Sequence, residues 1–175
     1  GTTLLMLDRT LPMDVNFVGV DDSHEMLVKC ESKLREHQVK RKVELQCTDL
    51  HLGVDMKDAS LALMVLTLQF LRPLHRERLI ADVFKGLREN GGLILVEKVL
   101  GEDSHFNRLF IKHYYDFKRR NGYSETEIAQ KREALENVLI PYKLLENREL
   151  LLKSGFRYVD VFFKWYNFCG IVAIK

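Results

Sequence analysis

The stretch Asn16-Phe-Val-Gly-Val-Asp-Asp-Ser23 carries the strongest evidence for the fold of this chain. Its uninterrupted apolar run is typical of a parallel strand buried on both faces, and the run ends in the acid Asp21. Ser23 can then cap a helix that extends to about His37, because apolar residues follow it at intervals of three and four. The stretch therefore predicts a strand that leads directly into a helix.

The same alternation of strand and helix continues on both sides of this stretch. We expect helices at residues 2–10 and 74–88, and strands at 43–47, 59–66 and 93–98. The second of these helices should end at Asn90-Gly91-Gly92, and the strand at 59–66 should be fully buried. Such a series with short connections predicts parallel βαβ units with right-handed crossovers.

The pattern changes in the C-terminal part of the chain. Residues 102–152 are helical in pattern, whereas 156–163 and 166–174 predict two antiparallel strands joined by a tight link near Lys164–Trp165. The fold class is therefore α/β and Rossmann-like, with a mostly parallel sheet and a C-terminal antiparallel hairpin. We expect one domain over residues 1–175, with a helical insertion at about 102–152.

The composition excludes several classes of protein. The 175 residues are 46% hydrophobic and 30% charged, and a net charge of +2 does not favour direct binding of nucleic acid. We expect the basic runs Lys40-Arg41-Lys42 and Lys118-Arg119-Arg120 to be solvated surface. The three cysteines and six histidines show no metal-ligand spacing, which favours a reducing cytoplasm and no metal site. No apolar run reaches the ~18–20 residues of a membrane span.

Acidic residues stand where three predicted strands end, at Asp21, Asp49 and Glu97. Ligands of parallel α/β sheets bind at the carboxyl ends of the strands. Asp21 could accept hydrogen bonds from both hydroxyls of a ribose; alternatively, Asp21 or Asp22 begins the helix and interacts with its dipole. Asp49, beside Leu50, could accept from the amine of an adenine, or it is a solvated loop acid.

Three features together fit a class I S-adenosylmethionine (SAM) fold. They are the acid after one strand, Thr48-Asp49-Leu50 after the next strand, and Gly91-Gly-Leu-Ile-Leu-Val96 before a later strand. We expect the side chain of Val65, in the central strand, to lie in the core and to reach a ligand only through its backbone. The aromatic residues at 114–117 and 165–168 are expected to pack the helix and the hairpin rather than to form a ligand wall.

Arg132 is the most distinctive single residue. Ser124 can cap a helix that begins near Glu125, and Glu127 completes a capping box. Arg132 lies one turn after Ile128, so its stem could be partly buried while its guanidinium binds a carboxylate through two hydrogen bonds. Alternatively, Arg132 forms an intrahelical ion pair with Glu136.

Several of these segments resemble the carboxy-S-adenosyl-L-methionine (carboxy-SAM) synthase family, and the resemblance covers the whole chain. The segments are Thr67-Leu-Gln-Phe-Leu71, Asp116-Phe-Lys-Arg119, Asn121-Gly-Tyr-Ser124, Gln130-Lys-Arg132, Leu135-Glu-Asn-Val138 and Tyr166-Asn-Phe-Cys-Gly170. The resemblance implies a homodimeric class I methyltransferase fold that converts SAM and prephenate to carboxy-SAM and phenylpyruvate. A separate enzyme would then use carboxy-SAM on the wobble uridine of tRNA.

The resemblance also assigns ligand contacts by position. It implies that ribose is bound by Asp21 and Asp22, adenine by Asp49 and Leu50, and the carboxylate of the product by Arg132. It further implies that Gly1 matches the last glycine of the SAM-binding loop and that Val65 replaces a cofactor-contacting asparagine.

Two further expectations concern the limits of this resemblance. Because Gly1 opens a helix directly, we expect the first strand and the N-terminal helices of the family to lie upstream of this sequence, leaving unpaired strand edges. The other functions that the sequence leaves open are direct methyl transfer to tRNA or a small molecule, in which Arg132 would bind a phosphate or carboxylate, and a non-catalytic SAM-binding partner subunit.

Overall fold

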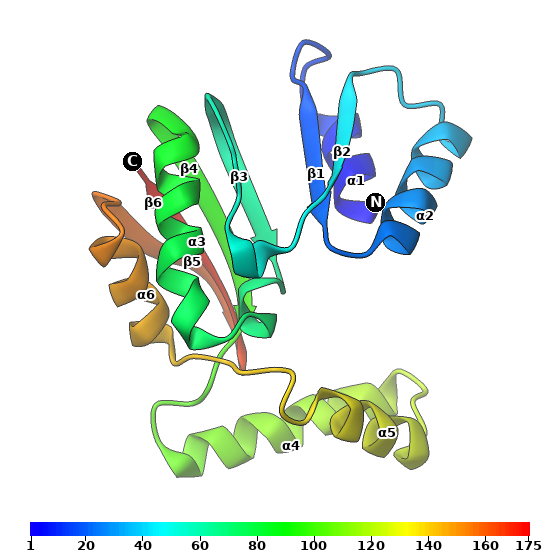
Figure 1. Cartoon of the computed structure of the whole chain (residues 1–175). Helices are drawn as coiled ribbons and strands as arrows, with labels where there is room; N and C mark the ends of the chain where they lie inside the picture. The colour runs from blue at the N-terminus through cyan, green and yellow to red at the C-terminus, as the bar shows by residue number, and fades with distance from the viewer. The chain divides into compact units, whose positions relative to one another are not determined.

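The computed structural model describes residues 1–175 and divides into two compact units (Figure 1). Unit 1 comprises Gly1–Leu52 and unit 2 comprises Gly53–Lys175. The expectation of a single domain over residues 1–175 stays a prediction.

Unit 1 is a two-stranded parallel sheet packed against two helices. Its elements are α1 (Thr2–Thr10), β1 (Phe17–Asp21), α2 (His24–Glu36), β2 (Val43–Cys47) and the short 3-10 helix η1 (Leu50–Leu52). Leu5 of α1 forms a small core with Cys30 and Leu34 of α2, and Val43 and Leu45 of β2 pack against it. Because both helices share this core, they cover the same face of the sheet.

The strand and the helix expected after Asn16 are confirmed, and Ser23 caps α2 by accepting from Met26 N. The expectation that the strand is buried on both faces is wrong for unit 1. Phe17 is buried, but Val18 is 56% exposed. The reason is that α1 and α2 cover one face of β1, so alternate side chains on the other face have no covering layer within this unit.

Arg41 is the main exception to the expected solvated basic runs. Its side chain is 0% exposed and forms an ion pair with Asp8 at 2.5 Å. The guanidinium donates to the carbonyl oxygens of Asp8, Leu11, Pro12 and Val15, and it lies 4.3 Å from the centroid of the Phe17 ring. Arg41 therefore ties the C-terminal end of α1 and the following loop to the sheet.

We expect Arg41→Ala to lower the free energy of unfolding by about 3–5 kcal/mol, since it leaves the Asp8 carboxylate and four part-buried carbonyls without this partner. Arg35→Ala is the matched control, because Arg35 forms an exposed i,i+4 pair with Glu31 and should cost at most about 0.5 kcal/mol. Chemical denaturation of both variants measures the difference. Equal losses of unfolding free energy in the two variants would show that the contacts of Arg41 contribute nothing specific.

Unit 2 contains a four-stranded mixed sheet with the strand order β3-β4-β6-β5. The elements in chain order are β3 (Ala59–Val65), η2 (Leu68–Phe70), α3 (Pro73–Gly86), β4 (Leu87–Lys98), α4 (Ser104–Arg120), α5 (Glu125–Leu135), α6 (Leu144–Lys153), β5 (Tyr158–Trp165) and β6 (Phe168–Ile174). β3 and β4 are parallel, whereas β6 is antiparallel to both β4 and β5. The predicted fold class, with parallel pairs and a C-terminal antiparallel hairpin, is confirmed, and the helical region at 102–152 contains α4, α5 and α6.

Both sheets have unpaired strand edges, and the expected upstream strand stays a prediction. β1 pairs with β2 alone and β3 pairs with β4 alone. β1 and β3 therefore each have one edge whose backbone groups are not paired with another strand.

Several element boundaries differ from the sequence prediction, and β4 begins at Leu87 rather than at residue 93. α3 ends at Gly86 rather than at residue 88, since Leu87 already has an extended backbone. The hairpin link lies at residues 166–167 rather than at 164–165. Lys164 and Trp165 still pair with β6, and Tyr166 adopts the left-handed conformation with a φ of 46°.

The expectation that residues 59–66 are fully buried is also wrong. Met64 is buried beside Leu95, its partner in register, whereas Leu61, Leu63 and Val65 are 37–43% exposed. Figure 1 shows α3 and α6 on the same face of the sheet. The exposed side chains alternate with Met64 and so lie on the face opposite these helices. Val65 is therefore not a core residue of unit 2.

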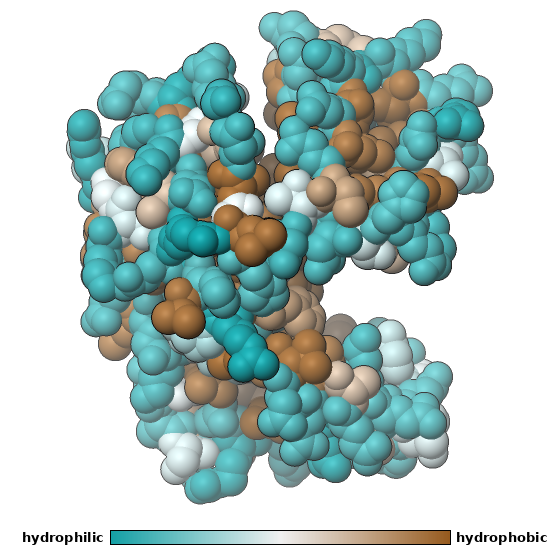
Figure 2. Space-filling model, in the orientation of Figure 1, coloured by the Kyte–Doolittle hydropathy of each residue, from teal (hydrophilic) through white to brown (hydrophobic).

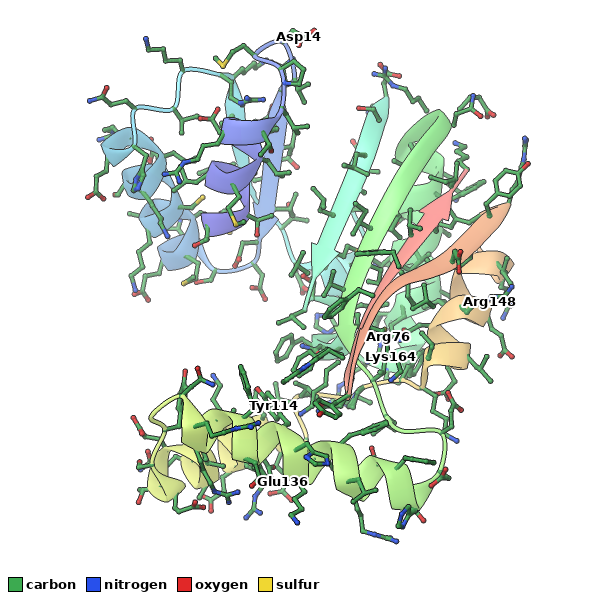
Figure 3. All side chains as sticks on the ribbon, turned by 180° about the vertical axis from the view of Figure 1, so that it is seen from behind. Asp14, Arg76, Tyr114, Glu136, Arg148 and Lys164 are labelled. Atoms are coloured by element: carbon green, nitrogen blue, oxygen red, sulfur yellow. The ribbon has the colours of Figure 1, made fainter.

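Helices α4 and α5 form the remaining layer of unit 2. They lie side by side beyond the ends of the strands, away from α3 and α6 (Figures 1 and 3). Figure 2 shows hydrophobic residues at the surface of unit 2 next to α5, on an otherwise largely hydrophilic face. None of the helices in the structure combines the length and the hydropathy required to cross a membrane.

Candidate functional site

In unit 1, the candidate adenosine-binding acids gather at the carboxyl end of the parallel sheet. Asp21 is the last residue of β1 and lies opposite Cys47, the last residue of β2. Its carboxylate accepts from Ser23 N at 2.9 Å, while its carbonyl oxygen accepts from Thr48 N at 3.0 Å. These bonds fix the direction of the Asp21 side chain at the edge where ligands of such sheets bind.

The other candidates in unit 1 have local roles as well. One carboxylate oxygen of Asp49 accepts from His51 N at 2.8 Å and lies 3.0 Å from His51 Nδ1, at the start of η1 with Leu50. Asp22 is exposed, and its carbonyl oxygen accepts from the thiol of Cys47. Thus the sheet places Asp21 and the loop that carries Asp49 at one edge.

Gly1 lies at the start of α1, close to α2. A Cβ on Gly1 would lie 3.1 Å from the sulfur of Cys30, which is tighter than an ordinary contact. Glycine therefore allows the N-terminus of α1 to approach α2, and the N–H groups at a helix N-terminus are suited to binding anionic groups.

In unit 2, α4, α5, η2 and the sheet line an open cavity of about 690 Å³. Four cationic side chains line it, together with aromatic and aliphatic residues and a single acid, Glu136. The cations are Lys98, Lys118, Lys131 and Arg132, and the aromatic residues are Phe70, Tyr114, Tyr115 and Phe168. A cavity with this lining is suited to an anion that has an apolar part.

The local sequence of α5 positions Arg132. The predicted capping box is confirmed, since Glu127 N donates to the Ser124 hydroxyl while Ser124 N donates to the Glu127 carboxylate. Ile128 is 5% exposed and anchors the helix, and Arg132 follows one turn later. Arg132 is exposed as a residue, yet it lines the cavity.

The alternative role for Arg132, an intrahelical pair with Glu136, is not formed. α5 ends at Leu135, and Glu136 has an extended backbone with φ −63° and ψ 132°. The i,i+4 geometry on which such a pair depends is therefore lost. Arg132 forms no ion pair in the structure, so its guanidinium is available to an anionic ligand.

Lys98 and Lys118 are cavity residues that sequence reasoning missed. Their ammonium nitrogens lie 5.5 Å and 4.9 Å from the centroid of the Tyr114 ring. Burial lowers the pKa of both lysines, and the positive charge of a neighbouring lysine lowers each further. The expectation that Lys118 is solvated surface is wrong, because it lies one turn after Tyr114 on the face of α4 that lines the cavity.

Tyr114 has both roles that the sequence analysis treated as alternatives. Its ring packs edge-on against Phe168 at a centroid distance of 5.3 Å and against Trp165 at 6.4 Å. It also lines the cavity, on the side of α4 that faces the sheet of unit 2 (Figure 3). The aromatic packing thus holds the ring that forms part of the cavity wall.

Glu97, expected among the ligand-binding acids, is 2% exposed and has a structural role. Its two carboxylate oxygens accept from the backbone nitrogens of Thr67, Leu68 and Gln69 at 2.8–3.0 Å. These bonds hold η2, which contributes Gln69 and Phe70 to the cavity lining. Burial raises the pKa of Glu97 to about 7, and the three N–H donors oppose that rise.

Because the folded protein holds a proton on Glu97 more tightly than the unfolded chain does, its contribution to stability is fully present below pH 4.5 and is lost as the pH rises to about 7. We expect the free energy of unfolding to fall by roughly 3 kcal/mol over this window from Glu97. Glu97→Gln should remove that dependence, whereas the exposed control Glu89→Gln should retain it. Urea titrations at several pH values measure the free energy of unfolding of both variants. Parallel pH profiles for the two variants would contradict the role of Glu97.

Curated relatives match the chain over its whole length. The chain is 65% identical over 176 aligned residues to the carboxy-S-adenosyl-L-methionine synthase of Methylococcus capsulatus, covering 100% of this chain and 73% of that protein. It is 42% identical to the carboxy-S-adenosyl-L-methionine synthase of Helicobacter pylori strain HPAG1, covering 72% of that protein. The chain belongs to the carboxy-S-adenosyl-L-methionine synthase family.

Two further comparisons support the fold of this carboxy-SAM synthase family member. The model of a methyltransferase domain matches residues 1–91. A SAM-dependent methyltransferase from Methanosarcina mazei has a TM-score of 0.66 at 18% identity, covering 99% of this chain and 86% of that one. YcgJ from Bacillus subtilis has a TM-score of 0.68 at 17% identity, covering 94% of this chain and 61% of that one. At these identities the solved structures show the fold alone, which is the predicted methyltransferase fold.

Proposed function

We propose that the chain converts SAM and prephenate to carboxy-SAM and phenylpyruvate. The observation that carries this proposal is the cavity of unit 2, in which an unpaired Arg132 lies among aromatic and aliphatic residues. The enzyme acts in the cytoplasm as a homodimer, and a separate enzyme uses its product to modify the wobble uridine of tRNA.

The residues of unit 1 bind the adenosine part of SAM. Asp21, with Asp22 beside it, accepts from the ribose hydroxyls, because its carboxylate is held at the carboxyl end of β1. Asp49 accepts from the adenine amine, and the Leu50 backbone contacts the ring. Gly1 contributes its end of α1 to binding of the methionine part.

Val65 contributes less than the asparagine that the family usually has at this position. It is the last residue of β3, its side chain is 43% exposed, and its carbonyl oxygen accepts from the Thr67 hydroxyl. A valine side chain can only pack against the cofactor. Van der Waals contact with SAM is therefore its role in this proposal.

The reaction moves one carboxyl group and one proton. The positive sulfur of SAM acidifies the adjacent methyl group, so loss of a proton gives a carbanion that the sulfonium stabilises. Prephenate loses its ring carboxyl and its ring hydroxyl as the ring becomes aromatic. The methyl carbon forms a bond to that carboxyl carbon, and the hydroxide leaves with the methyl proton as water. Arg132 stabilises the carboxylate that forms on the methyl carbon.

Mass spectrometry of the cofactor after incubation with SAM, with and without prephenate, tests this function. The proposal expects a cofactor that has gained one carboxyl group only when prephenate is present. Formation of S-adenosylhomocysteine with tRNA would instead indicate direct methyl transfer. If neither product forms, the chain acts as a non-catalytic SAM-binding subunit and the proposal is wrong.

A further inference from the structure

The cavity of unit 2 holds more positive charge than one carboxylate requires. Its lining has four cations and one acid, Glu136. The cations come from three elements, since Lys98 ends β4, Lys118 belongs to α4, and Lys131 and Arg132 belong to α5. The proposed carboxylate of the product accounts for Arg132 but leaves Lys98 and Lys118 without a role.

Lys98 and Lys118 lie on the same aromatic ring without an acidic partner. Their ammonium groups are 5.5 Å and 4.9 Å from the centroid of Tyr114, so both lie close to one side chain. Both are half-buried, and neither forms an ion pair in the structure. Both cations are partly removed from water, and the charge of Lys118 lowers the pKa of Lys98, so a bound anion would stabilise the charged form of both.

Several other lysines in unit 2 have a hydrogen-bond acceptor. Lys164 and Lys175 also lie on aromatic rings, but their ammonium groups donate to the carbonyl oxygens of Tyr166 and Leu87. Lys153 pairs with Glu77, and Lys57 pairs with Asp55 at 3.2 Å, both at exposed positions. Lys98 and Lys118 are more buried than Lys57 and Lys153 and lie only on aromatic rings, Lys98 on that of Tyr114 and Lys118 on those of Tyr114 and Tyr123. The Tyr114 ring offers its negative face, but it carries no net charge to neutralise two ammonium groups. The pair thus has the character of an anion-binding site.

We propose that Lys98 and Lys118 bind a carboxylate of the second substrate, and that this pair makes the enzyme specific for a dicarboxylate over a monocarboxylate. The assignment rests on the proposed function and adds two residues to it. Arg132 binds the carboxylate that is transferred to the cofactor, whereas the lysine pair binds the carboxylate that the second substrate retains. Tyr114 positions the pair through its ring, which Phe168 and Trp165 hold in place.

Lys98→Met and Lys118→Met in the full-length enzyme test this assignment. Each variant should raise both the Kd and the KM for prephenate about 10- to 100-fold, because a charged hydrogen-bond donor to the substrate is lost. The Kd for SAM should stay within about twofold, since the adenosine contacts of the proposal lie on other residues. Lys118→Arg keeps the charge and should recover most of the affinity for prephenate.

Lys112→Met is the matched control, because Lys112 is an exposed lysine on α4 that does not line the cavity. Thermal unfolding provides a readout that separates binding from folding. Removal of a half-buried, unpaired charge should leave the melting temperature of Lys98→Met equal to or above that of the parent enzyme. A purely structural lysine would instead give a lower melting temperature with unchanged prephenate affinity.

Prephenate binding is measured by calorimetry as well as by turnover, so the two proposals can fail separately. If the parent enzyme forms carboxy-SAM and the lysine variants bind prephenate as tightly as it does, the lysine assignment is overturned and the function stands. If the parent enzyme binds prephenate through the lysine pair without forming carboxy-SAM, the function fails and the assignment stands. If the parent enzyme does not bind prephenate, both are overturned.

Discussion

Replacing Arg132 by alanine should lower the rate of carboxy-SAM formation by about 10²- to 10³-fold, as expected when a fixed donor to a developing anion is removed. The guanidinium has no ion pair to lose, and Ile128 rather than Arg132 anchors α5, so the fold should be retained. Binding of SAM should change by less than about threefold, because SAM lacks the carboxylate that Arg132 holds. Single-turnover mass spectrometry and calorimetry measure these two quantities.

Arg120→Ala controls for the loss of an arginine elsewhere in unit 2. Arg120 is the last residue of α4, is exposed and does not line the cavity, so its removal should leave product formation unchanged. The prediction for Arg132 is wrong if product formation and SAM affinity fall by the same factor. That result would assign Arg132 to general binding of the cofactor rather than to its carboxylate.

Replacing Asp21 by alanine should weaken SAM binding by about 10- to 100-fold, since a carboxylate that accepts from ribose hydroxyls contributes about 1.5–3 kcal/mol. Asp21 also accepts from Ser23 N, so circular dichroism must show that α2 remains folded. Asp21→Asn keeps one acceptor oxygen and should fall between the parent enzyme and the alanine variant. Calorimetry with SAM measures the three affinities.

Asp14→Ala is the control for Asp21, because Asp14 is an exposed acid in the loop before β1 (Figure 3). Its removal changes the net charge by the same amount without touching the carboxyl end of the sheet. If Asp14→Ala and Asp21→Ala weaken SAM binding equally, the effect is one of overall charge. The ribose role of Asp21 would then be rejected.

Features that depend on neighbouring residues could be predicted from the sequence. The capping box of α5 needs only Ser124 and Glu127, and both of its hydrogen bonds are present. The strand that ends at Asp21 is likewise a local pattern of apolar residues. In these cases the partners lie within about one helical turn, so a short stretch of sequence contains all the information.

Features that depend on distant residues could not be predicted in this way. Arg41 pairs with Asp8, which lies 33 residues away, so the buried guanidinium was mistaken for part of an exposed basic run. Glu97 accepts from backbone groups 28–30 residues away, so a strand-end acid was mistaken for a ligand-binding one. The approach of Lys98 in β4 to the Tyr114 ring in α4 is another contact between separate elements, which residue spacing alone does not reveal.

The central claim is that Arg132 holds the carboxyl group that distinguishes carboxy-SAM from SAM. A crystal structure of the full-length enzyme soaked with carboxy-SAM tests it directly. The account predicts that the guanidinium of Arg132 donates two hydrogen bonds of about 2.9 Å to that carboxylate. A structure in which the carboxylate is bound by other groups while Arg132 points into solvent would contradict it.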